Sequence, residues 1–337
     1  DGFAVDHVIC PEESIVRYMQ KLVEFPEALQ VLEFGQGCAQ LVALRVPRGG
    51  VLEGRTIAEF RERFPEVRVR LVALYRQEFE LQCEGDTRIH AGDETFLLAE
   101  RDRLREVLKV LHGTDRPVRR IMMAGGGNVG LRLAHRLAGQ CEVKLIARDA
   151  RRCERLATEL PGEVLVLHGD ATDEELLADE NVASMDMFLA LTSDDEDNIL
   201  SAMLAKRLGA RRVLALINRR AYAELIQGGT IDIAVSPAQT VIGELLAHVR
   251  RGDVVAVHSL RRGAAEALEG VARGDARTSR LVGRSIEQLE TTLPRGVRIG
   301  AVLRGPEGGL EVLMPAHDLV IETDDHLVLF IPQKRQV

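Results

Sequence analysis

The sequence contains no tryptophan, and aromatic residues make up only 4% of its 337 residues. Proteins that bind single-stranded nucleic acids stack the bases on exposed aromatic side chains. Acidic residues also outnumber basic ones, 52 to 44, a balance opposite to the one that a phosphate backbone attracts. The composition therefore argues against nucleic acid as a partner.

Cysteine is scarce and shows no pattern: the five residues are widely spaced and form no C-x-x-C pair (Cys10, Cys38, Cys83, Cys141, Cys153). Such spacing indicates reduced thiols in the cytosol rather than a disulfide framework or a metal centre. No apolar run approaches the roughly 18 to 20 residues of a membrane span, which predicts a soluble protein. The first residues lack the basic and apolar regions of a signal peptide. Because the chain does not start with Met, we expect it to be a fragment.

Hydrophobic residues are plentiful, at 46%, and support packed cores. A chain of this length predicts two to three domains at roughly 150 residues each. The sequence also repeats itself. Three pairs of segments match in the same order: 5–11 with 231–237, Gly54 and Pro65 with Gly283 and Pro294, and Asp93 with Asp324. The matches predict two tandem copies, the first lacking about one nucleotide-binding unit at its start.

The repeat predicts four segments. Residues 1–25 are the remnant of a first large domain, 26–112 a small domain, 118–251 a complete large domain, and 252–337 a second small domain. Segments 12–25 and 238–251 have the periodicity of amphipathic helices, and we expect them to join large domain to small.

The large domain is predicted to be a doubly wound α/β unit. Its apolar strand-length runs are 120–124, 142–146, 164–167, 187–191, 213–217 and 231–235. The helical stretches between them are 131–138, 150–160, 173–178, 197–208 and 221–225. This alternation is typical of a six-stranded parallel sheet with helices on both faces.

A glycine-rich segment joins the first strand to the first helix: Gly125, Gly126, Gly127, Asn128, Val129, Gly130. In this context G-x-G-x-x-G is the dinucleotide fingerprint. Gly125 would make the tight turn, Gly127 would let a phosphate approach the backbone, and Gly130 would let the helix pack closely. The free N–H groups of the helix N-terminus would then face the anion. The alternative is a glycine-rich turn that binds nothing.

Ligands of such sheets lie beyond the carboxyl ends of the strands. Those ends carry the other candidate residues for nucleotide binding: Arg148, Asp149, Asp170, Thr192, Ser193 and Asn218. The acid that usually holds the ribose is missing, because Ala147 stands at its place. Asp149 would compensate if the strand ran on, Arg148 would meet a phosphate, or both are solvated loop charges.

Two of these positions could instead have a purely structural role. Asp170 either accepts a nucleotide hydrogen bond or caps the next helix, and Thr192 is either a rim contact or an N-cap. The acidic run 194–197 would repel a nucleotide, so we expect it to face solvent, a partner or a cation.

The small domains show no catalytic motif and no metal-ligand spacing. In the second one we expect strands at 254–258, 297–303, 310–313 and 327–331, and helices at 264–271 and 285–289. His317 near Asp318, and His326 near 324–325, are either acid–base pairs or ordinary surface residues. A basic group, Arg261, Arg262, Arg273 and Arg277, either contacts anionic lipid or a partner or is a solvated face. Exposed strand edges favour dimerisation.

These motifs together resemble the TrkA family of RCK-domain subunits of bacterial Trk potassium-uptake systems. The most specific segments are 125–130, 191–198 with 202–207, and 259–267. The resemblance implies that 118–251 is an RCK-N domain, that 26–112 and 252–337 are RCK-C domains, and that 1–25 ends a first RCK-N domain. It covers essentially the whole chain.

The resemblance implies regulation rather than catalysis. Members of the family bind NAD(H) or ATP/ADP in the RCK-N clefts and assemble as homo-oligomeric rings on the inner face of the plasma membrane, beneath a TrkH/TrkG-type potassium-translocating subunit. By position, Gly125 to Val129 would hold the phosphates, and Thr192, Ser193 and Asn218 would line the rim. Ala147 stands where the family usually has an acid. The alternatives are an NAD(P)-dependent oxidoreductase and an RCK regulator of another cation channel or antiporter.

Overall fold

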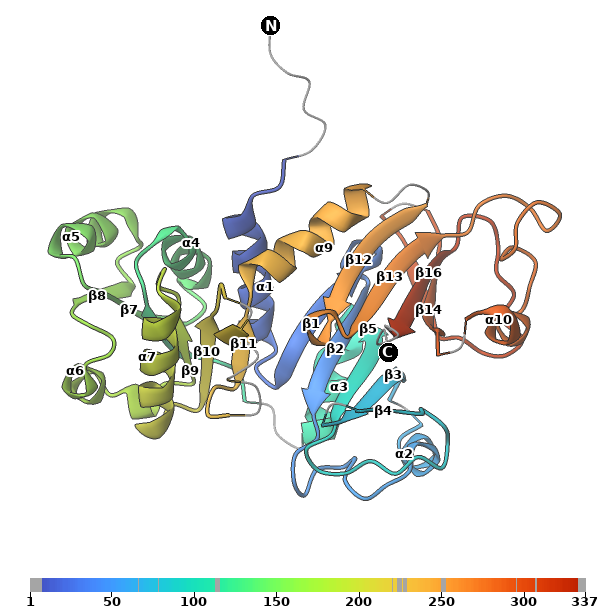
Figure 1. Ribbon diagram of the computed structural model, residues 1–337, viewed down its shortest axis with the longest axis horizontal. Coiled ribbons are helices and arrows are strands. Elements are labelled where there is room, and N and C mark those ends of the chain that lie inside the picture. Colours follow the sequence, from blue (N-terminus) through green and yellow to red (C-terminus); the bar gives the residue numbers. More distant parts are fainter. Residues whose placement is uncertain are drawn as a thin grey trace, which may run out of the picture. The chain divides into compact units, whose positions relative to one another are not determined.

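The computed structural model describes residues 8–332, except 66, 78, 113–115, 220, 223–225, 227–228, 250–252, 295 and 307, and except the side chains of 247–249 and 262. The chain divides into two compact units. The first contains residues up to Pro26 and 116–241, and the second contains 27–115 and 242–337. Figure 1 labels the elements and colours them along the sequence. Among the described residues no helix is both long and apolar enough to cross a bilayer.

The first unit contains the predicted six-stranded parallel sheet, in the order β11-β10-β9-β6-β7-β8. The strands are β6 (Arg120–Ala124), β7 (Glu142–Ala147), β8 (Val164–His168), β9 (Met187–Ala190), β10 (Arg212–Leu216) and β11 (Ile233–Val235). The order reverses between β6 and β9, which creates the crevice where nucleotides bind in doubly wound sheets. The predicted fold class is confirmed.

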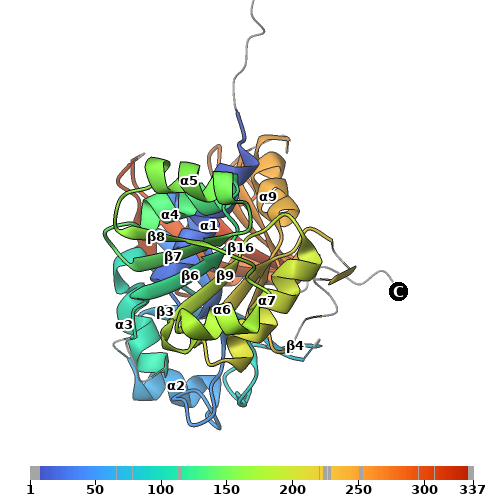
Figure 2. The same cartoon turned by 90° about the vertical axis from the view of Figure 1, so that its left-hand side faces the viewer.

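Helices cover both faces of this sheet. They are α1 (Pro11–Glu24), α4 (Asn128–Leu137), α5 (Ala150–Glu159), α6 (Glu174–Asp179) and α7 (Asp195–Arg207). Figure 2 shows α4 and α5 on one side of the strands and α6 and α7 on the other. Strands β6 and β9 are buried along nearly their whole length, because both of their faces are covered. The predicted helices are confirmed, except that most of 221–225 lies outside the described residues.

The second unit contains two five-stranded antiparallel sheets of identical topology, β1-β2-β5-β3-β4 and β12-β13-β16-β14-β15. The first has β1 (Ala28–Phe34), β2 (Ala39–Arg45), β3 (Val69–Arg76), β4 (Phe79–Leu81) and β5 (Glu94–Glu100), with α2 (Ile57–Arg63) and α3 (Arg101–His112). The second has β12 (Val254–Leu260), β13 (Ala265–Val271), β14 (Arg298–Arg304), β15 (Glu311–Leu313) and β16 (His326–Pro332), with α10 (Ile286–Thr292). Helix α9 (Pro237–Val249) begins in the first unit and ends in the second.

The helix predicted at 264–271 is wrong, because this segment is strand β13. Its residues alternate strictly between buried and half-buried, and it pairs with β12 on one side and with β16 on the other. Its alanines favour a helix in isolation, but two ladders of backbone hydrogen bonds override that preference. The small domain therefore has five strands rather than four.

The repeat is confirmed in the two small domains, with one correction, whereas residues 5–7 of the matching pair 5–11 and 231–237 lie outside the described residues. Gly54 and Gly283 have φ angles of 77° and 80°, and they donate backbone hydrogen bonds to Ile89 and Ile321. The carboxylate equivalent to Asp93, however, belongs to Asp325 and not to Asp324. Asp93 accepts two hydrogen bonds from Arg76, and Asp325 accepts two from Arg304. The side chain of Asp324 is exposed and pairs with Arg273.

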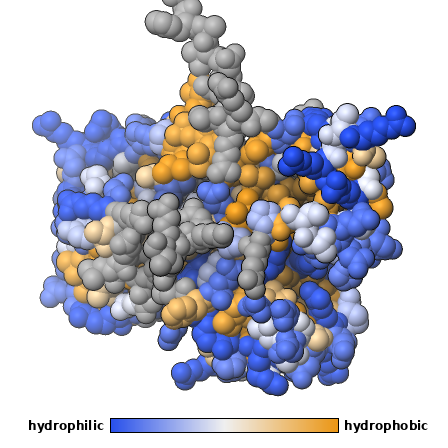
Figure 3. Space-filling view, turned by 45° about the vertical axis from the view of Figure 1, so that its right-hand side comes forward, coloured by the Kyte–Doolittle hydropathy of each residue, from blue (hydrophilic) through white to orange (hydrophobic). Residues whose placement is uncertain are grey.

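Two further expectations for the second small domain fail. The imidazole of His326 bonds to Glu269, not to 324–325 as the acid–base alternative requires. Arg261 does not belong to a solvated basic face, since only 6% of its side chain is exposed. Arg273 and Arg277 are exposed, as a solvated face predicts. Figure 3 shows hydrophilic and hydrophobic residues intermingled on the face that it views.

Candidate functional site

The glycine-rich loop between β6 and α4 has a shape that side chains would prevent. Gly125 has a φ of 116°, and a Cβ there would lie 2.7 Å from the carbonyl of Leu191, at the end of β9. A Cβ on Gly130 would overlap the carbonyl oxygen of Gly125. Two glycines thus let the loop, the neighbouring strand and α4 approach one another closely.

Gly127 differs from these two, because a Cβ there would meet no atom within 4 Å. It is the N-cap of α4, and no side-chain hydrogen bond caps the helix. The backbone N–H groups of the first helical turn have no capping side chain, and the helix dipole favours negative charge there. The arrangement fits a phosphate or diphosphate group.

The side chain of Asn128 lies at the same helix end, beside Glu12 on α1. The pKa of the Glu12 carboxyl is lowered, chiefly by its own backbone N–H, with smaller contributions from Cys10 and Asn128. An acid therefore stands next to Asn128.

Strand β7 ends at Ala147, so Asp149 cannot take the place of the missing ribose acid. The Asp149 carboxylate instead caps α5 and accepts a 2.7 Å hydrogen bond from the backbone nitrogen of Arg152. The idea that the strand continues to Asp149 is wrong, because the chain turns at once into the helix.

Arg148 lies across the strand ends and pairs with two carboxylates. It is hydrogen-bonded to Asp197 at the start of α7, and its Nη1 lies 3.7 Å from Oδ2 of Asp170 after β8. The pKa of Arg148 is raised, first by the hydrogen bond with Asp197. About half of its side chain is exposed. The guanidinium is therefore near the crevice but engaged by acids.

Asp170 closes a local turn. Its Oδ1 accepts hydrogen bonds from the backbone nitrogen of Thr172 at 2.9 Å and from the hydroxyl at 2.8 Å. The first of these is the main cause that lowers the pKa of the Asp170 carboxyl. The cap of the next helix is Asp173, so the capping alternative for Asp170 is wrong.

Thr192 is held by Asn198, a residue that the sequence did not single out as part of the site. Oδ1 of Asn198 accepts from the backbone nitrogen and the hydroxyl of Thr192, both at 2.8 Å, and its amide donates to Leu216 on β10. Asn198 is completely buried. The N-cap of α7 is Asp194 rather than Thr192, and Ser193 between them is exposed.

Asn218 is also fixed from α7. Its backbone nitrogen and its side-chain amide both donate to Oδ1 of Asp195 at 2.9 Å, and the backbone nitrogen of Arg219 donates to Oδ2 at 2.8 Å. Asp195 is only 4% exposed. The expectation that the whole acidic run faces solvent, a partner or a cation is therefore wrong for Asp195, and Asp197 is paired with Arg148.

A second arginine reaches the glycine loop. Nε of Arg152 donates a 2.7 Å hydrogen bond to the carbonyl of Gly126. The sequence signal for this residue is its place in the first turn of α5, three residues after the capping Asp149. Arg152 at the loop and Arg148 at the strand ends thus supply two cations, whereas the described residues contain no group of three side chains suited to a metal ion.

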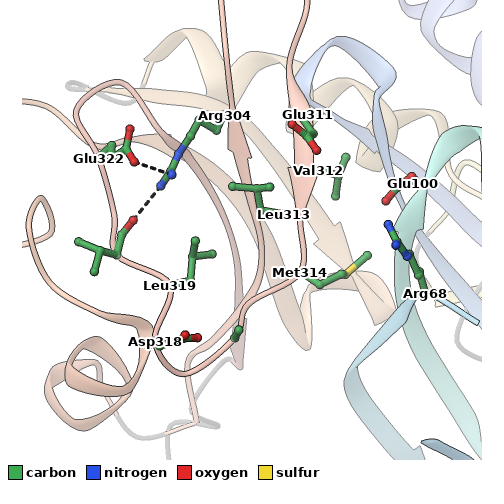
Figure 4. A pocket seen from close by; sticks show the side chains of 12 residues that line it. Arg68, Glu100, Arg304, Glu311, Val312, Leu313, Met314, Asp318, Leu319 and Glu322 are labelled. Carbon is green, nitrogen blue, oxygen red and sulfur yellow. Dashed lines mark hydrogen bonds and ion pairs between the residues drawn. The ribbon is translucent and has the colours of Figure 1, made fainter. Parts of the chain in front are cut away.

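A cavity of about 590 Å³ lies in the second unit and is lined by none of the residues of this crevice (Figure 4). Its lining combines apolar residues with side chains of both charges: Arg68, Glu100, Arg304, Glu311, Val312, Leu313, Met314, Ala316, Asp318, Leu319, Val320 and Glu322. Arg304 is held by Asp325 and Glu322, so its charge is already compensated. We therefore assign the functional site to the glycine loop.

Family models agree with this layout: the TrkA-N domain matches residues 121–237, and the TrkA-C domain matches 41–112. The Trk system potassium uptake protein TrkA of Vibrio alginolyticus is 48% identical over 334 residues, 99% of this chain and 71% of that protein. The chain belongs to the TrkA family. Relatives of the same name extend to Halomonas elongata, at 48% identity over 100% of this chain and 72% of that protein. A TrkA homolog of Archaeoglobus fulgidus is 33% identical, over 96% of this chain and 71% of that protein.

Solved structures share the fold of this TrkA-family chain. The RCK domain of GsuK aligns with a TM-score of 0.52 at 18% identity, over 98% of this chain and 68% of that one. The GsuK channel bound to NAD aligns with a TM-score of 0.51 at 17% identity, over 96% of this chain and 56% of that one. At this level of identity the likeness concerns the fold alone.

Proposed function

We propose that the chain is a nucleotide-binding regulatory subunit of a Trk-type potassium-uptake system. The observation that carries the proposal is the loop geometry. A Cβ on Gly125 or Gly130 would collide with backbone atoms, whereas a Cβ on Gly127, at the N-terminus of α4, would meet no atom within 4 Å. This combination suits an anionic ligand and has no use as a packing element. Membership in the TrkA family supports the link to potassium uptake.

In this proposal residues 118–251 act as the RCK-N domain, and 26–112 and 252–337 act as RCK-C domains, with 1–25 ending a first RCK-N domain. The ligand is NAD(H) or an adenine nucleotide, ATP or ADP. Gly125 to Val129 hold its phosphates through backbone N–H groups. Thr192, Ser193 and Asn218 form the rim of the crevice. The NAD-bound GsuK channel, which shares the fold, supports the choice of NAD.

Ala147 makes recognition of the ribose weaker than in relatives with an acid at this position. A carboxylate there would accept hydrogen bonds from the ribose hydroxyls. The two arginines near the loop favour ligands rich in phosphate instead. Arg152 already lies on the loop carbonyl, and Arg148 becomes available when a phosphate competes with Asp197 for its guanidinium.

The ligand regulates the protein if it binds two of its conformations with different affinities, because it then shifts the equilibrium between them. Helix α9 begins in the unit that holds the site and ends in the other unit, so it is an element through which a change can pass. We expect nucleotide to alter hydrogen exchange within α9. Unchanged exchange there at saturating ligand would exclude α9 as the lever.

The partner is a potassium-translocating membrane subunit of the TrkH/TrkG type, which the chain meets as a homo-oligomer on the inner face of the plasma membrane. An RCK regulator of another channel or antiporter would have the same site. Co-purification with a tagged membrane subunit of either kind separates the two.

Titration calorimetry with NADH, NAD+, ATP and ADP tests the proposed ligand site. We expect stoichiometric binding of at least one of them, lost in Gly127→Asp because a carboxylate then occupies the anion site. Gly162→Asp is the matched control, since a Cβ on Gly162 also meets nothing within 4 Å but the residue lies in another loop. Absence of binding by all four ligands would contradict the proposal.

A further inference from the structure

Two equivalent turns in the second unit have different residues. Gly35 and Arg261 each follow the last residue of the first strand of their sheet, in the tight turn before the second strand. Both have left-handed backbone conformations, with φ angles of 56° and 45°. One turn therefore has no side chain where the other has a guanidinium.

Arg261 reaches from the second small domain into the first. Its Nη2 donates a 2.6 Å hydrogen bond to the carbonyl of Gln77, and its Nε lies 3.4 Å from a carboxylate oxygen of Glu94. The guanidinium carbon lies 4.2 Å from the centre of the Tyr75 ring. The side chain is 6% exposed, so these contacts replace nearly all of its hydration.

Gly35 faces the second small domain in the equivalent place, but the fit depends on its missing side chain. A Cβ on Gly35 would lie 2.5 Å from Cδ1 of Leu303. Its backbone nitrogen donates a 2.9 Å hydrogen bond to Glu269, a residue only 1% exposed. The other oxygen of Glu269 lies 2.6 Å from the imidazole of His326.

The strand registers show that the two sets of contacts are counterparts. They make Tyr75 equivalent to Leu303, Glu94 to His326, and Ala43 to Glu269. Tyr75 and Glu94, which contact Arg261, thus correspond to Leu303, which lies beside Gly35, and to His326, which bonds to the Glu269 that holds Gly35. The pair of domains has two-fold related backbones and complementary side chains.

Pairs of like domains would lose this fit. Two second domains would place Arg261 against Leu303, where even a Cβ is crowded, and beside a Glu269 that already holds His326. Two first domains would place Gly35 opposite Tyr75, leaving the space of the arginine side chain empty and depriving Glu94 of the guanidinium. Voids and the loss of a charge pair are costly in interfaces.

We propose that Arg261 and Glu269 form a recognition element that pairs the second small domain with the first small domain of the same chain and excludes pairs of like domains. The partner that this surface fits is a domain with glycine at the turn and an aromatic–acid pair beside it. The proposal assigns a role to the segment 259–267 and does not depend on nucleotide binding.

Disulfide trapping tests the pairing. Val72 and Gly300 are equivalent in register and meet each other, since a Cβ on Gly300 would lie 3.1 Å from Cγ1 of Val72. In a full chain whose native cysteines are replaced by serine, Val72→Cys with Gly300→Cys should form a disulfide within one chain under mild oxidation. Each single variant should form no interchain disulfide, because only a pair of like domains would bring two copies of the same cysteine together. Interchain disulfides in the single variants, or between tagged and untagged chains of the double variant, would overturn the proposal.

Charge reversal tests the two-residue assignment. In the double-cysteine chain, Arg261→Glu faces Glu94 with a second carboxylate and should slow disulfide formation about tenfold or more. Adding Glu94→Arg should restore most of the rate. Arg277→Glu, an equal charge change on an exposed residue of the same domain, should have no effect. An unchanged rate in Arg261→Glu would contradict the role of this arginine.

A measurement in the chain with native cysteines covers the case in which the cysteine variants fail to fold. Glu269→Ala removes the acceptor of the Gly35 N–H, so exchange of that amide should accelerate at least about tenfold. Exchange of the Gly54 amide, which is bonded within the first domain, is the internal control. Equal protection of Gly35 in both proteins would count against the proposal.

Discussion

The carboxylate of Asp195 holds Asn218 by two 2.9 Å hydrogen bonds, although the two residues follow different strands. Asp195 begins α7 after β9, and Asn218 follows β10. The contact ties together two neighbouring connections at the carboxyl edge of the sheet. The rim of the proposed site is therefore built before any ligand arrives.

Replacement of Asp195 should destabilise the first unit. Asp195→Ala leaves the backbone N–H groups of Asn218 and Arg219 and the side-chain amide of Asn218 without this acceptor, so we expect a loss of about 1 to 3 kcal/mol in the free energy of unfolding. Hydrogen exchange of β9 and β10 amides measures this locally. Asp179→Ala, on the exposed side of α6, should change the same amides by no more than about 0.5 kcal/mol. Similar effects of both substitutions would show that the hydrogen bonds from Asn218 and Arg219 to Asp195 do not stabilise the first unit.

The two kinds of glycine in the loop should respond differently to alanine. Gly130→Ala forces a methyl group onto the carbonyl of Gly125, so it should lower stability and ligand binding together. Gly127→Ala has room for its methyl group and should leave the melting temperature nearly unchanged, while it weakens binding by obstructing the phosphate. Thermal unfolding and calorimetry on the same samples distinguish the two outcomes. Equal losses of stability would contradict the open space at Gly127.

Restoring an acid at the end of β7 should strengthen NAD binding. Ala147→Glu offers a carboxylate to the ribose hydroxyls, and a charge-assisted hydrogen bond of about 1.5 kcal/mol corresponds to roughly tenfold in affinity. Ala147→Gln is the control, because it has the same size without the charge and should gain less. Weaker binding in Ala147→Glu would mean that the ribose lies elsewhere.

Much of the structure of the first unit could be predicted, because it depends on sequence patterns between residues that are close together in the chain. The six strands and the roles of Gly125, Gly127 and Gly130 follow from apolar runs and from spacing. The polar contacts of the site could not be predicted, because Asp195 and Asn198 act across strands that are neighbours only in the folded sheet. The strand β13 was missed for the same reason, since its preference is set by pairing with β12 and β16.

Lowering the pH should selectively weaken the hydrogen bonds of Asp186, which lie at the opposite edge of this sheet. Asp186 accepts hydrogen bonds from the backbone nitrogens of Arg119 and Arg120, at 2.8 and 3.0 Å. Burial acts to raise the pKa of the Asp186 carboxyl, but these hydrogen bonds and Arg211 outweigh it, so the pKa is lowered overall. A carboxyl with a lower pKa in the folded state stabilises the fold above its unfolded pKa, about 3.9, and loses this contribution as the pH falls through the folded value.

Asp186→Asn should therefore be less stable than the parent chain at pH 7, by about 1 kcal/mol. The difference between the two proteins in the free energy of unfolding should become smaller below about pH 4, because the parent carboxyl also becomes neutral there. Urea unfolding of both proteins at several pH values, followed through β6 amides, measures the gap. Asp179→Asn provides the baseline, because its exposed carboxylate should show no such narrowing. A gap that stays constant down to pH 2.5 would mean that the amide groups of Arg119 and Arg120 do not stabilise the ionised carboxylate.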